Sequence, residues 1–355
     1  MRYLQVALLV MIGLLSCTSS KIDEASVQGS PKKMRALIID GENNHGVWPK
    51  TTIMMKRYLE QTDLFIVDVE RTKYIWQGPH YDKSIGVEDI TDLLELYPVV
   101  NAGATISVEE PQADPDFSPD FTAYDLVINN MGWKASTWPA ATKKNFEKYM
   151  KGGGGLIIVH AANNSWGDWS EYNKMIGLGG WGGRTEKDGP YVYYNDAGDE
   201  IRDAGEGDCG SHGPQHEYVM TTRAGDHPIM RGLPAKWMHA KDELYDRLRG
   251  PATNMTVLAT AYSDVEGNAQ PWNKEVKGTG RHEPLLIAVE YGKGRIFHTV
   301  LGHMDYSMEC VGFVTTLQRG AEWAATGEVT QGVPSDFPDD VSVSKRKWSW
   351  KSAAN

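Results

Sequence analysis

The sequence predicts an α/β protein built on a doubly wound, mostly parallel β-sheet. Short apolar runs rich in β-branched residues alternate with amphipathic segments of helical period, a pattern typical of strand–helix–strand units with right-handed crossovers. Four consecutive glycines at 152–155 separate one predicted helix from the next predicted strand. The sequence contains no internal repeat and no clear linker, so we expect one domain with loop insertions.

The first half of the chain supplies the predicted parallel strands. Pro49 suits the first position of the helix that follows the first strand, and the segment 111–119 is rich in proline and is predicted to be a loop. The predicted strands cover residues 34–40, 64–69, 124–129 and 156–159, and the predicted helices cover 49–61, 139–151 and 166–176.

The second half adds shorter strands and one long irregular segment. Residues 179–213 are rich in glycine and aspartate, which is typical of a binding loop or a cover inside a compact domain. Further strands are predicted at 191–194, 217–221, 257–262, 285–290 and 295–301, and a closing helix at 313–325. The turn Tyr291–Gly294 predicts an antiparallel hairpin near the C-terminus.

Composition limits the classes of partner. The 355 residues carry a net charge of −11 with no basic run in the body of the chain, so we expect no nucleic-acid partner. Twelve Trp and sixteen Tyr against seven Phe form an unusual aromatic set. These rings stack on polar rings while keeping a hydrogen-bonding tip, which fits carbohydrate contact, although a place in the core or at its rim explains most of them.

The N-terminus indicates export. Arg2 precedes an apolar run over 6–15 that is too short to span a bilayer as a mature helix. The run ends Leu14-Leu15-Ser16-Cys17, which resembles the lipobox of bacterial lipoproteins. Residues 1–16 are then a signal peptide, Cys17 is lipidated, and 17–33 form a tether. A secretory signal with an incidental cysteine is the alternative. We expect a cell-envelope protein, anchored at the periplasmic face or the outer membrane.

Two further cysteines, Cys209 and Cys310, remain. In an oxidising compartment they are able to pair, but two buried free thiols fit the sequence as well. Neither cysteine has the spacing of a thiolate zinc site.

Histidines stand where predicted parallel strands end. His160 directly follows one strand, His45 lies in the loop after the first strand, and His303 follows the last strand through Gly302. Ligands of parallel α/β sheets bind just beyond the carboxyl ends of the strands, so these histidines and Trp133 mark a candidate site. Each histidine also fits a structural role that caps the sheet with a backbone hydrogen bond.

The second half adds carboxylates and more imidazoles. A spacing of three places His239 beside Asp242 on one face of a predicted helix, with Glu243 diverging from Asp242. One carboxylate is then placed to orient an imidazole while the other faces substrate; a plain surface helix is the alternative. His212 and His216 are spaced as a metal pair, although Gly213 and Pro214 argue against the helix that would align them.

Several reaction classes lack their motifs. The glycine run precedes a strand, so it is neither a dinucleotide loop nor a phosphate loop. The sequence has no Gly-x-Ser-x-Gly or Gly-x-Cys-x-Gly elbow, which argues against a serine or cysteine nucleophile.

Taken together, six segments make the chain resemble the ThuA-like (trehalose utilisation) family of the class I glutamine amidotransferase-like superfamily. They are residues 37–45, 153–162, 212–217, 227–229, 237–245 and 292–303. The resemblance covers 34–326, leaves 327–355 as a C-terminal tail, and implies a flavodoxin-like fold and a role with sugars, including oxidised 3-keto sugars or glycosides. Where the amidotransferases carry their cysteine nucleophile, this chain has His160-Ala161-Ala162, so we expect no glutaminase activity.

We therefore predict an enzyme that acts on a sugar or 3-keto-glycoside by isomerase, lyase or hydrolase chemistry. His160 and His45 are the predicted acid/base groups, with Asp242 or Glu243 as orienting group or base. The predicted substrate-binding residues are Trp133, Asn163, Trp166, His239, Tyr245, Arg281 and His303. A non-catalytic sugar-binding lipoprotein and a metal-dependent glycoside hydrolase using His212 and His216 are the alternatives. We predict no cofactor, and the sequence is compatible with a bound divalent metal ion and with a homo-oligomer.

Overall fold

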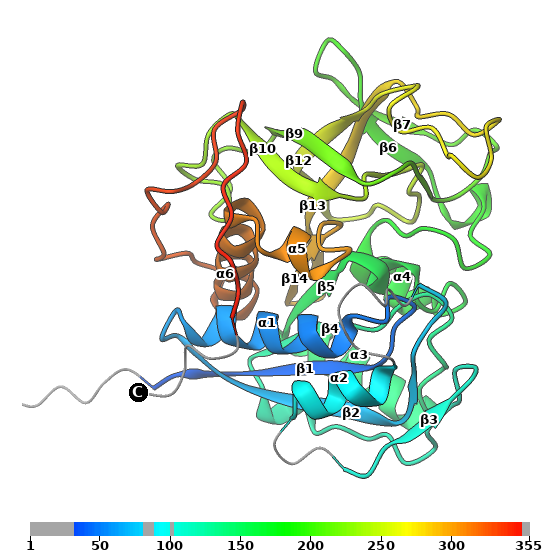
Figure 1. Ribbon diagram of the computed structural model, residues 1–355, viewed down its shortest axis with the longest axis vertical. Helices are drawn as coiled ribbons and strands as arrows, with labels where there is room; N and C mark the ends of the chain where they lie inside the picture. The colour runs from blue at the N-terminus through cyan, green and yellow to red at the C-terminus, as the bar shows by residue number, and fades with distance from the viewer. Residues whose placement is uncertain (1–31, 81–88, 100–102, 350–355) are drawn as a thin grey trace, which may run out of the picture. The chain divides into compact units, whose positions relative to one another are not determined.

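A computed structural model describes residues 32–80, 89–99 and 103–349 of the chain (Figure 1). The predicted signal peptide, Cys17 and most of the predicted tether lie outside the described residues. Within those ranges no helix is long and apolar enough to cross a membrane.

Most strands of the described residues join into one large mixed sheet. Its order is β10-β9-β12-β13-β14-β5-β4-β1-β2-β3, and β6 and β7 extend from β13. Neighbouring strands from β14 to β3 are all parallel, which we call the parallel half. It comprises β1 (Met34–Glu42), β2 (Phe65–Trp76), β3 (Ile106–Val108), β4 (Leu126–Asn129), β5 (Gly155–Val159) and β14 (Gly294–Thr299).

The remaining strands pair antiparallel and form the antiparallel half. They are β6 (Tyr191–Tyr194), β7 (Glu200–Asp203), β9 (His216–Thr222), β10 (Lys236–Asp242), β12 (Met255–Ser263) and β13 (Arg281–Tyr291). The predicted hairpin joins β13 to β14, with Gly292 at a φ of 61° in its turn. A separate pair links β8 (Ser211–His212) to β11 (Tyr245–Asp246).

Helices cover both faces of the parallel half (Figure 1). On one face lie α1 (Trp48–Glu60), α5 (Asp305–Met308) and α6 (Val311–Thr326), with α2 (Ile90–Leu96) packed outside α1; on the other lie α3 (Ala140–Gly152) and α4 (Ser170–Ile176). Short 3₁₀ turns are η2 (Phe121–Ala123), η3 (His160–Asn164) and η4 (Glu186–Asp188). The predicted doubly wound α/β fold is confirmed.

The glycine run serves close packing. Gly153 ends α3 with a left-handed φ of 117°, which favours glycine. A Cβ on Gly154 would lie 2.3 Å from the Tyr149 ring, and one on Gly155 would lie 2.7 Å from the Ala324 carbonyl oxygen. Strand β5 therefore sits tightly between α3 and α6, which fixes the place where it ends.

Other predictions need correction. The segment from His239 to Asp242 belongs to strand β10 and is not a helix. Helix α4 begins only at Ser170, because the chain first makes the η3 turn. Helix α2 and strand β3 were not predicted, since their apolar runs are short. Cys209 and Cys310 are both buried free thiols.

Candidate active site

A cavity of about 600 Å³ lies beyond the carboxyl ends of the parallel strands, where loops of the antiparallel half meet them. It is lined by aromatic, imidazole and amide side chains: Asn44, His45, His80, Trp133, Asn164, Trp181, His212, Gln215, Glu243, Tyr245, Gln270, Trp272 and His303. A second cavity of about 620 Å³, around Pro119 and Lys148, is lined by no histidine. The chemistry-bearing side chains of the described residues therefore gather in the first cavity.

His160 occupies the first position after β5 in a left-handed backbone conformation, with φ at 44°. For a residue other than glycine this costs about 1–2 kcal/mol, so the surrounding contacts must hold it in place. Its Nδ1 lies 2.6 Å from the carbonyl oxygen of Val300. Since a carbonyl only accepts, Nδ1 carries a proton, and in the neutral ring Nε2 presents a lone pair.

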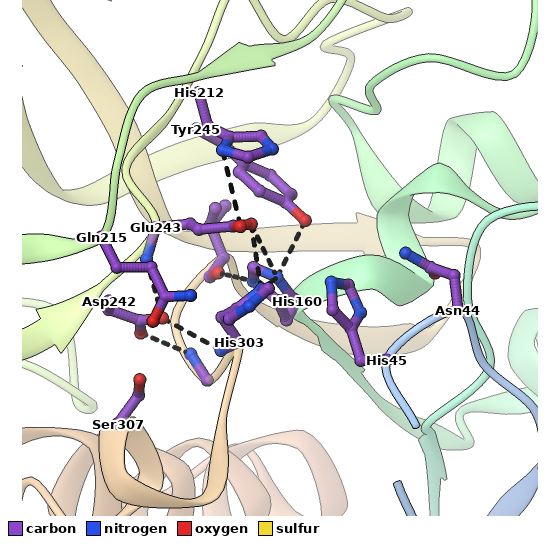
Figure 2. Close-up of polar contacts among 12 residues, drawn as sticks. Asn44, His45, His160, His212, Gln215, Asp242, Glu243, Tyr245, His303 and Ser307 are labelled. Carbon is purple, nitrogen blue, oxygen red and sulfur yellow. Dashed lines mark hydrogen bonds and ion pairs between the residues drawn. The ribbon is translucent and has the colours of Figure 1, made fainter. Parts of the chain in front are cut away.

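Three polar groups surround that Nε2 atom (Figure 2). The Tyr245 hydroxyl lies 2.8 Å away, His303 Nδ1 3.3 Å away and a Glu243 carboxylate oxygen 3.5 Å away. The same Glu243 oxygen, Oε2, is 3.0 Å from His303 Nδ1, and Oε1 is 3.5 Å from His212 Nδ1. Glu243 is thus shared among three imidazoles.

His45 approaches the group from the loop after β1. Its ring centre lies 4.4 Å from that of His303 and 5.0 Å from that of His160. The backbone N–H and the ring Nδ1 of His45 both face the side-chain oxygen of Asn43, at 2.9 and 3.2 Å. Nδ1–H therefore donates to that oxygen, and Nε2 of His45 also presents a lone pair.

One nitrogen or oxygen from each of four buried residues lies within 4.8 Å of the others: His45, His160, Glu243 and His303. We call these four residues the His₃Glu cluster. Three imidazoles and a carboxylate are ligands that divalent metal ions accept, so the cluster is able to hold one.

Burial and mutual charge set the ionisation of the His₃Glu cluster. Burial, reinforced by His303 and His160, holds the pKa of His45 well below its usual range. Burial raises the pKa of the Glu243 carboxyl, but His303 and His160 outweigh it and hold that pKa well below normal. Burial lowers the pKa of His303, yet Glu243 outweighs burial and raises it. The carboxylate is therefore ionised beside a neutral His45.

Tyr245 remains a phenol at the edge of the cluster. Burial, reinforced by the Glu243 charge, raises the pKa of its hydroxyl well above the usual value. The hydroxyl therefore donates to the lone pair on His160 Nε2.

Asp242 lies behind the cluster and not in the cavity. Its oxygens accept the backbone N–H groups of Gly302, His303 and Glu243 at 2.7, 3.0 and 2.9 Å. Its fourth contact, at 2.8 Å, is the Nε2 of His239. Burial lowers the pKa of His239, but Cys310 and Asp242 outweigh it and raise the value to about 9. The buried pair thus positions two members of the cluster.

A bulge explains how His239 and Asp242 meet on a strand. Residues three apart on a regular strand point to opposite faces. The pairing of β10 with β9 shifts register between these two residues, which turns both side chains toward each other. The expected proximity therefore arises from an irregular strand and not from helical spacing.

The structure brings together seven of the residues that the sequence singled out. His45, His160, Glu243, His303 and Tyr245 meet as described, and Trp133 and His212 line the same cavity. Trp133 belongs to the loop after β4, whereas His212 belongs to β8.

Other predicted residues lie elsewhere. Trp166 packs among the core rings of Trp138, Trp169 and Tyr172. Arg281 pairs with Glu283 and lies over the Tyr193 ring.

Two polar candidates are also separate from the cavity. Asn163 is buried against His298, with its Nδ2 3.0 Å from the ring Nε2. His216 turns its Nδ1 toward the carbonyl of Pro214, 2.8 Å away, and is not part of the His₃Glu cluster.

Sequence reasoning missed several cavity residues. Trp272 is 62 % exposed, and its ring centre is 5.1 Å from that of His212. His80, Asn164, Trp181 and Gln270 also line the cavity. The available signal was an aromatic residue inside a polar loop, as for Trp272 between β12 and β13, where no core exists to bury it.

Comparison with known proteins decides the family. A family model described as trehalose utilisation, ThuA, matches residues 35–324. The chain belongs to the ThuA family. A solved ThuA-like protein from Parabacteroides merdae ATCC 43184 has 41% identity, covers 89% of this chain and 98% of its own, and has a TM-score of 0.71.

A ThuA-like protein from Bacteroides uniformis ATCC 8492 has 17% identity and a TM-score of 0.46, with 86% and 98% of the two chains covered. Among curated proteins, none matches this sequence. Membership of the ThuA family assigns this chain to carbohydrate metabolism and confirms the resemblance.

Proposed function

We propose that this ThuA protein is an enzyme that removes a proton beside the carbonyl group of a 3-keto sugar or 3-keto-glycoside. The observation that carries the proposal is the convergence of the His₃Glu cluster and the Tyr245 hydroxyl on one side of a 600 Å³ cavity. Trp133, Trp181 and Trp272 also line this cavity, as aromatic rings do in carbohydrate sites.

The chemistry follows from the acidity of the carbon beside a ketone. In a 3-keto-glycoside a base removes the hydrogen at C2, and the electron pair moves onto the keto oxygen. Return of a proton to carbon completes isomerisation or epimerisation. Alternatively, the pair re-forms the carbonyl and expels the glycosidic oxygen from C1, which takes up a proton and leaves as an alcohol. All three reactions need a base, a proton donor and a group that stabilises the oxyanion.

We assign the stabilising role to the imidazoles of the His₃Glu cluster, which Glu243 holds in place, and proton transfer to the groups around the cluster. Tyr245 reaches the cluster at 2.8 Å, and His212 reaches the outer oxygen of Glu243 at 3.5 Å. About a fifth of the His212 side chain, 21 %, is accessible to solvent, which makes it the most accessible of the three imidazoles that contact Glu243. These assignments differ from the sequence expectation, which gave the acid/base roles to His160 and His45.

Hydrogen exchange tests the proposal without knowledge of the final product. The full chain is incubated in D₂O with 3-keto-glucosides, and NMR follows deuterium at C2 and release of the alcohol. We expect exchange that slows at least about tenfold in Tyr245→Phe and is unchanged in Glu217→Gln, a carboxamide control on the exposed side of β9. Sugar binding without exchange would instead support the alternative, a non-catalytic sugar-binding protein.

We also propose that the protein is exported and anchored to the envelope through a lipid on Cys17, with the membrane as its partner. The Leu14-Leu15-Ser16-Cys17 pattern supports this proposal. Metabolic labelling with a fatty acid should mark the wild type and not Cys17→Ala. Equal labelling of both would refute lipidation at Cys17.

A further inference from the structure

We propose that the His₃Glu cluster is a binding site for one divalent transition-metal ion of the Zn²⁺, Fe²⁺ or Mn²⁺ class. Metal binding at this site stands on the geometry alone. The role assigned to the ion, which is to bind the keto oxygen of the sugar, rests on the proposed function.

Three of the four ligand atoms already have the spacing that an ion requires. His160 Nε2, His303 Nδ1 and Glu243 Oε2 are separated by 3.3, 3.0 and 3.5 Å. Ligands bound at about 2.0–2.2 Å lie roughly 2.8–3.6 Å from one another, from octahedral to tetrahedral arrangements. The triangle is therefore close to one face of a metal coordination sphere, and His45 supplies a fourth nitrogen within 4.8 Å.

The hydrogen bonds of two histidines leave the correct nitrogen free for an ion. His160 donates its Nδ1–H to the Val300 carbonyl, and His45 donates its Nδ1–H to Asn43. A metal-bound histidine typically donates its second nitrogen to a carbonyl or amide oxygen in this way, which fixes the ring and its tautomer. Both Nε2 lone pairs then lie in the cluster, beside an ionised carboxylate.

The backbone holds the ligands rigidly. His45, His160 and His303 follow the ends of β1, β5 and β14. The backbone N–H groups of His303 and Glu243 share the buried Asp242 carboxylate, so two ligands are fixed by one group. Preorganisation of this kind is what a tight metal site needs, because little chain entropy is lost when the ion binds.

The site also opens toward the cavity. His45, Glu243 and His303 all contribute to the cavity wall, so an ion among them faces the space available to substrate. With four protein ligands, a five- or six-coordinate ion retains a position for the keto oxygen. A Lewis acid at that oxygen withdraws electron density and makes the C2 hydrogen more acidic. Tyr245 and His212 remain for proton transfer.

The pair expected from spacing is not part of this site. His216 faces the Pro214 carbonyl, and His212 contacts the outer oxygen of Glu243. His216→Ala is consequently a matched histidine control.

The test measures metal binding directly. The full chain is stripped with a chelator and titrated with Co²⁺, whose visible absorption reports the coordination geometry, and with Zn²⁺ by calorimetry. We expect one ion per chain and an affinity at least about a hundredfold lower in Glu243→Gln and in His303→Ala. His216→Ala should bind as the wild type does. Far-UV circular dichroism establishes that each variant is folded.

A further variant separates the proposed ligands from their neighbour. The Tyr245 hydroxyl donates to the same lone pair on His160 that the ion would take, so Tyr245→Phe should bind metal at least as tightly as the wild type. Loss of metal binding in Tyr245→Phe, or wild-type affinity in both Glu243→Gln and His303→Ala, would overturn the ligand set.

The same samples distinguish the metal site from the proposed reaction. Stoichiometric metal without C2 deuterium exchange refutes the proposed function and leaves the site established. Undiminished exchange in the stripped protein, measured with chelator present, refutes the role of the ion.

Discussion

The parallel and antiparallel halves of the sheet both contribute residues to the cavity, but they place these residues in different ways. In the parallel half, His160 directly follows β5, and His45 and His303 lie in the loops just beyond β1 and β14. In the antiparallel half, Glu243 and Tyr245 reach the cavity after the bulged end of β10. The parallel half therefore presents three imidazoles beyond the carboxyl ends of its strands, although β1 also shifts register near its end. In the antiparallel half, a register shift in β10 precedes the carboxylate that completes the cluster.

Each half also contains a buried aspartate with a different task. In the parallel half, Asp40 receives two hydrogen bonds from Arg71, both at 2.8 Å, and one from Thr52. In the antiparallel half, Asp242 pairs with His239 and holds the backbone of two cluster residues. The first aspartate stabilises the fold, and the second ties the fold to the site.

Substitution of the two aspartates gives the largest expected effect. Asp242→Asn and Asp40→Asn each leave a buried cation without its partner, and each should lower the free energy of unfolding by about 3–5 kcal/mol. Urea denaturation measures the loss. Only Asp242→Asn should also reduce turnover per folded molecule, because Asp40 does not touch the cluster. Equal turnover losses in both variants would contradict this division of roles.

Glu243→Gln tests the contribution of the antiparallel half to chemistry. Removal of the carboxylate that holds three imidazoles should reduce kcat for a 3-keto-glycoside about 10²–10³-fold, as loss of one preorganised active-site group does. NMR of substrate and product in samples quenched at successive times measures kcat. Retention of more than a tenth of the activity would exclude Glu243 as a central group.

Two buried histidines give the halves opposite pH responses. His298 on β14 is neutral, because burial, offset in part by its hydrogen bond to Ile176, lowers its pKa from 6.5 to about 4. Between pH 6.5 and 4 only the unfolded chain binds that proton. The contribution of neutral His298 to the free energy of unfolding is therefore fully present above pH 6.5 and is lost as the pH falls toward 4. The pKa of His239 is raised to about 9, so the contribution of protonated His239 to the free energy of unfolding is fully present below pH 6.5. That contribution is lost as the pH rises through 9.

His298→Asn isolates the acid response. Asparagine retains a donor for the Ile176 carbonyl but does not titrate. Between pH 6.5 and 4 the wild type should lose roughly 3 kcal/mol more stability than the variant. Urea denaturation midpoints measured across this pH range test the difference. If stability falls equally with pH in both proteins, His298 does not titrate as described.

Substitution of an aromatic residue in the cavity wall should have the smallest effect on activity. Trp272 comes from the antiparallel half and Trp133 from the parallel half, and each lines the cavity apart from the cluster. Trp272→Ala should raise KM about tenfold with kcat nearly unchanged, because stacking contributes to binding and not to the transition state alone. Tyr262→Ala, on an exposed ring packed against His282, is the control. A kcat loss larger than the KM change would contradict a binding role.

The sequence predicts most strands of both halves, but it predicts where the parallel half meets the site better than where the antiparallel half does. Buried parallel strands are continuous apolar runs, and the carboxyl-end rule then points to His45, His160 and His303. Asp242 and Glu243 stood out as adjacent carboxylates, but a helix was predicted where β10 carries a bulge. Register shifts depend on pairing between distant strands, which no local pattern contains.

Long loops account for the rest of what was missed. Trp166 and Trp272 both occur in polar, glycine-containing surroundings, yet one is buried among core rings and the other is 62 % exposed. Only the three-dimensional path of the chain separates them. His80 escaped notice for the same reason, since its ring meets His45 at 5.6 Å between centres across 35 residues of sequence.

The Asp242 carboxylate, which several backbone N–H groups share, limits how related sequences are able to change the cavity. It couples the end of β10 to the turn after β14, so the deepest part of the cavity behaves as one unit and cannot widen at one wall alone. The outer rim formed by Gln270 and Trp272 lies on the loop between β12 and β13, which this anchor does not contact. Exchange of that loop would alter which sugars enter while the reacting centre keeps its geometry.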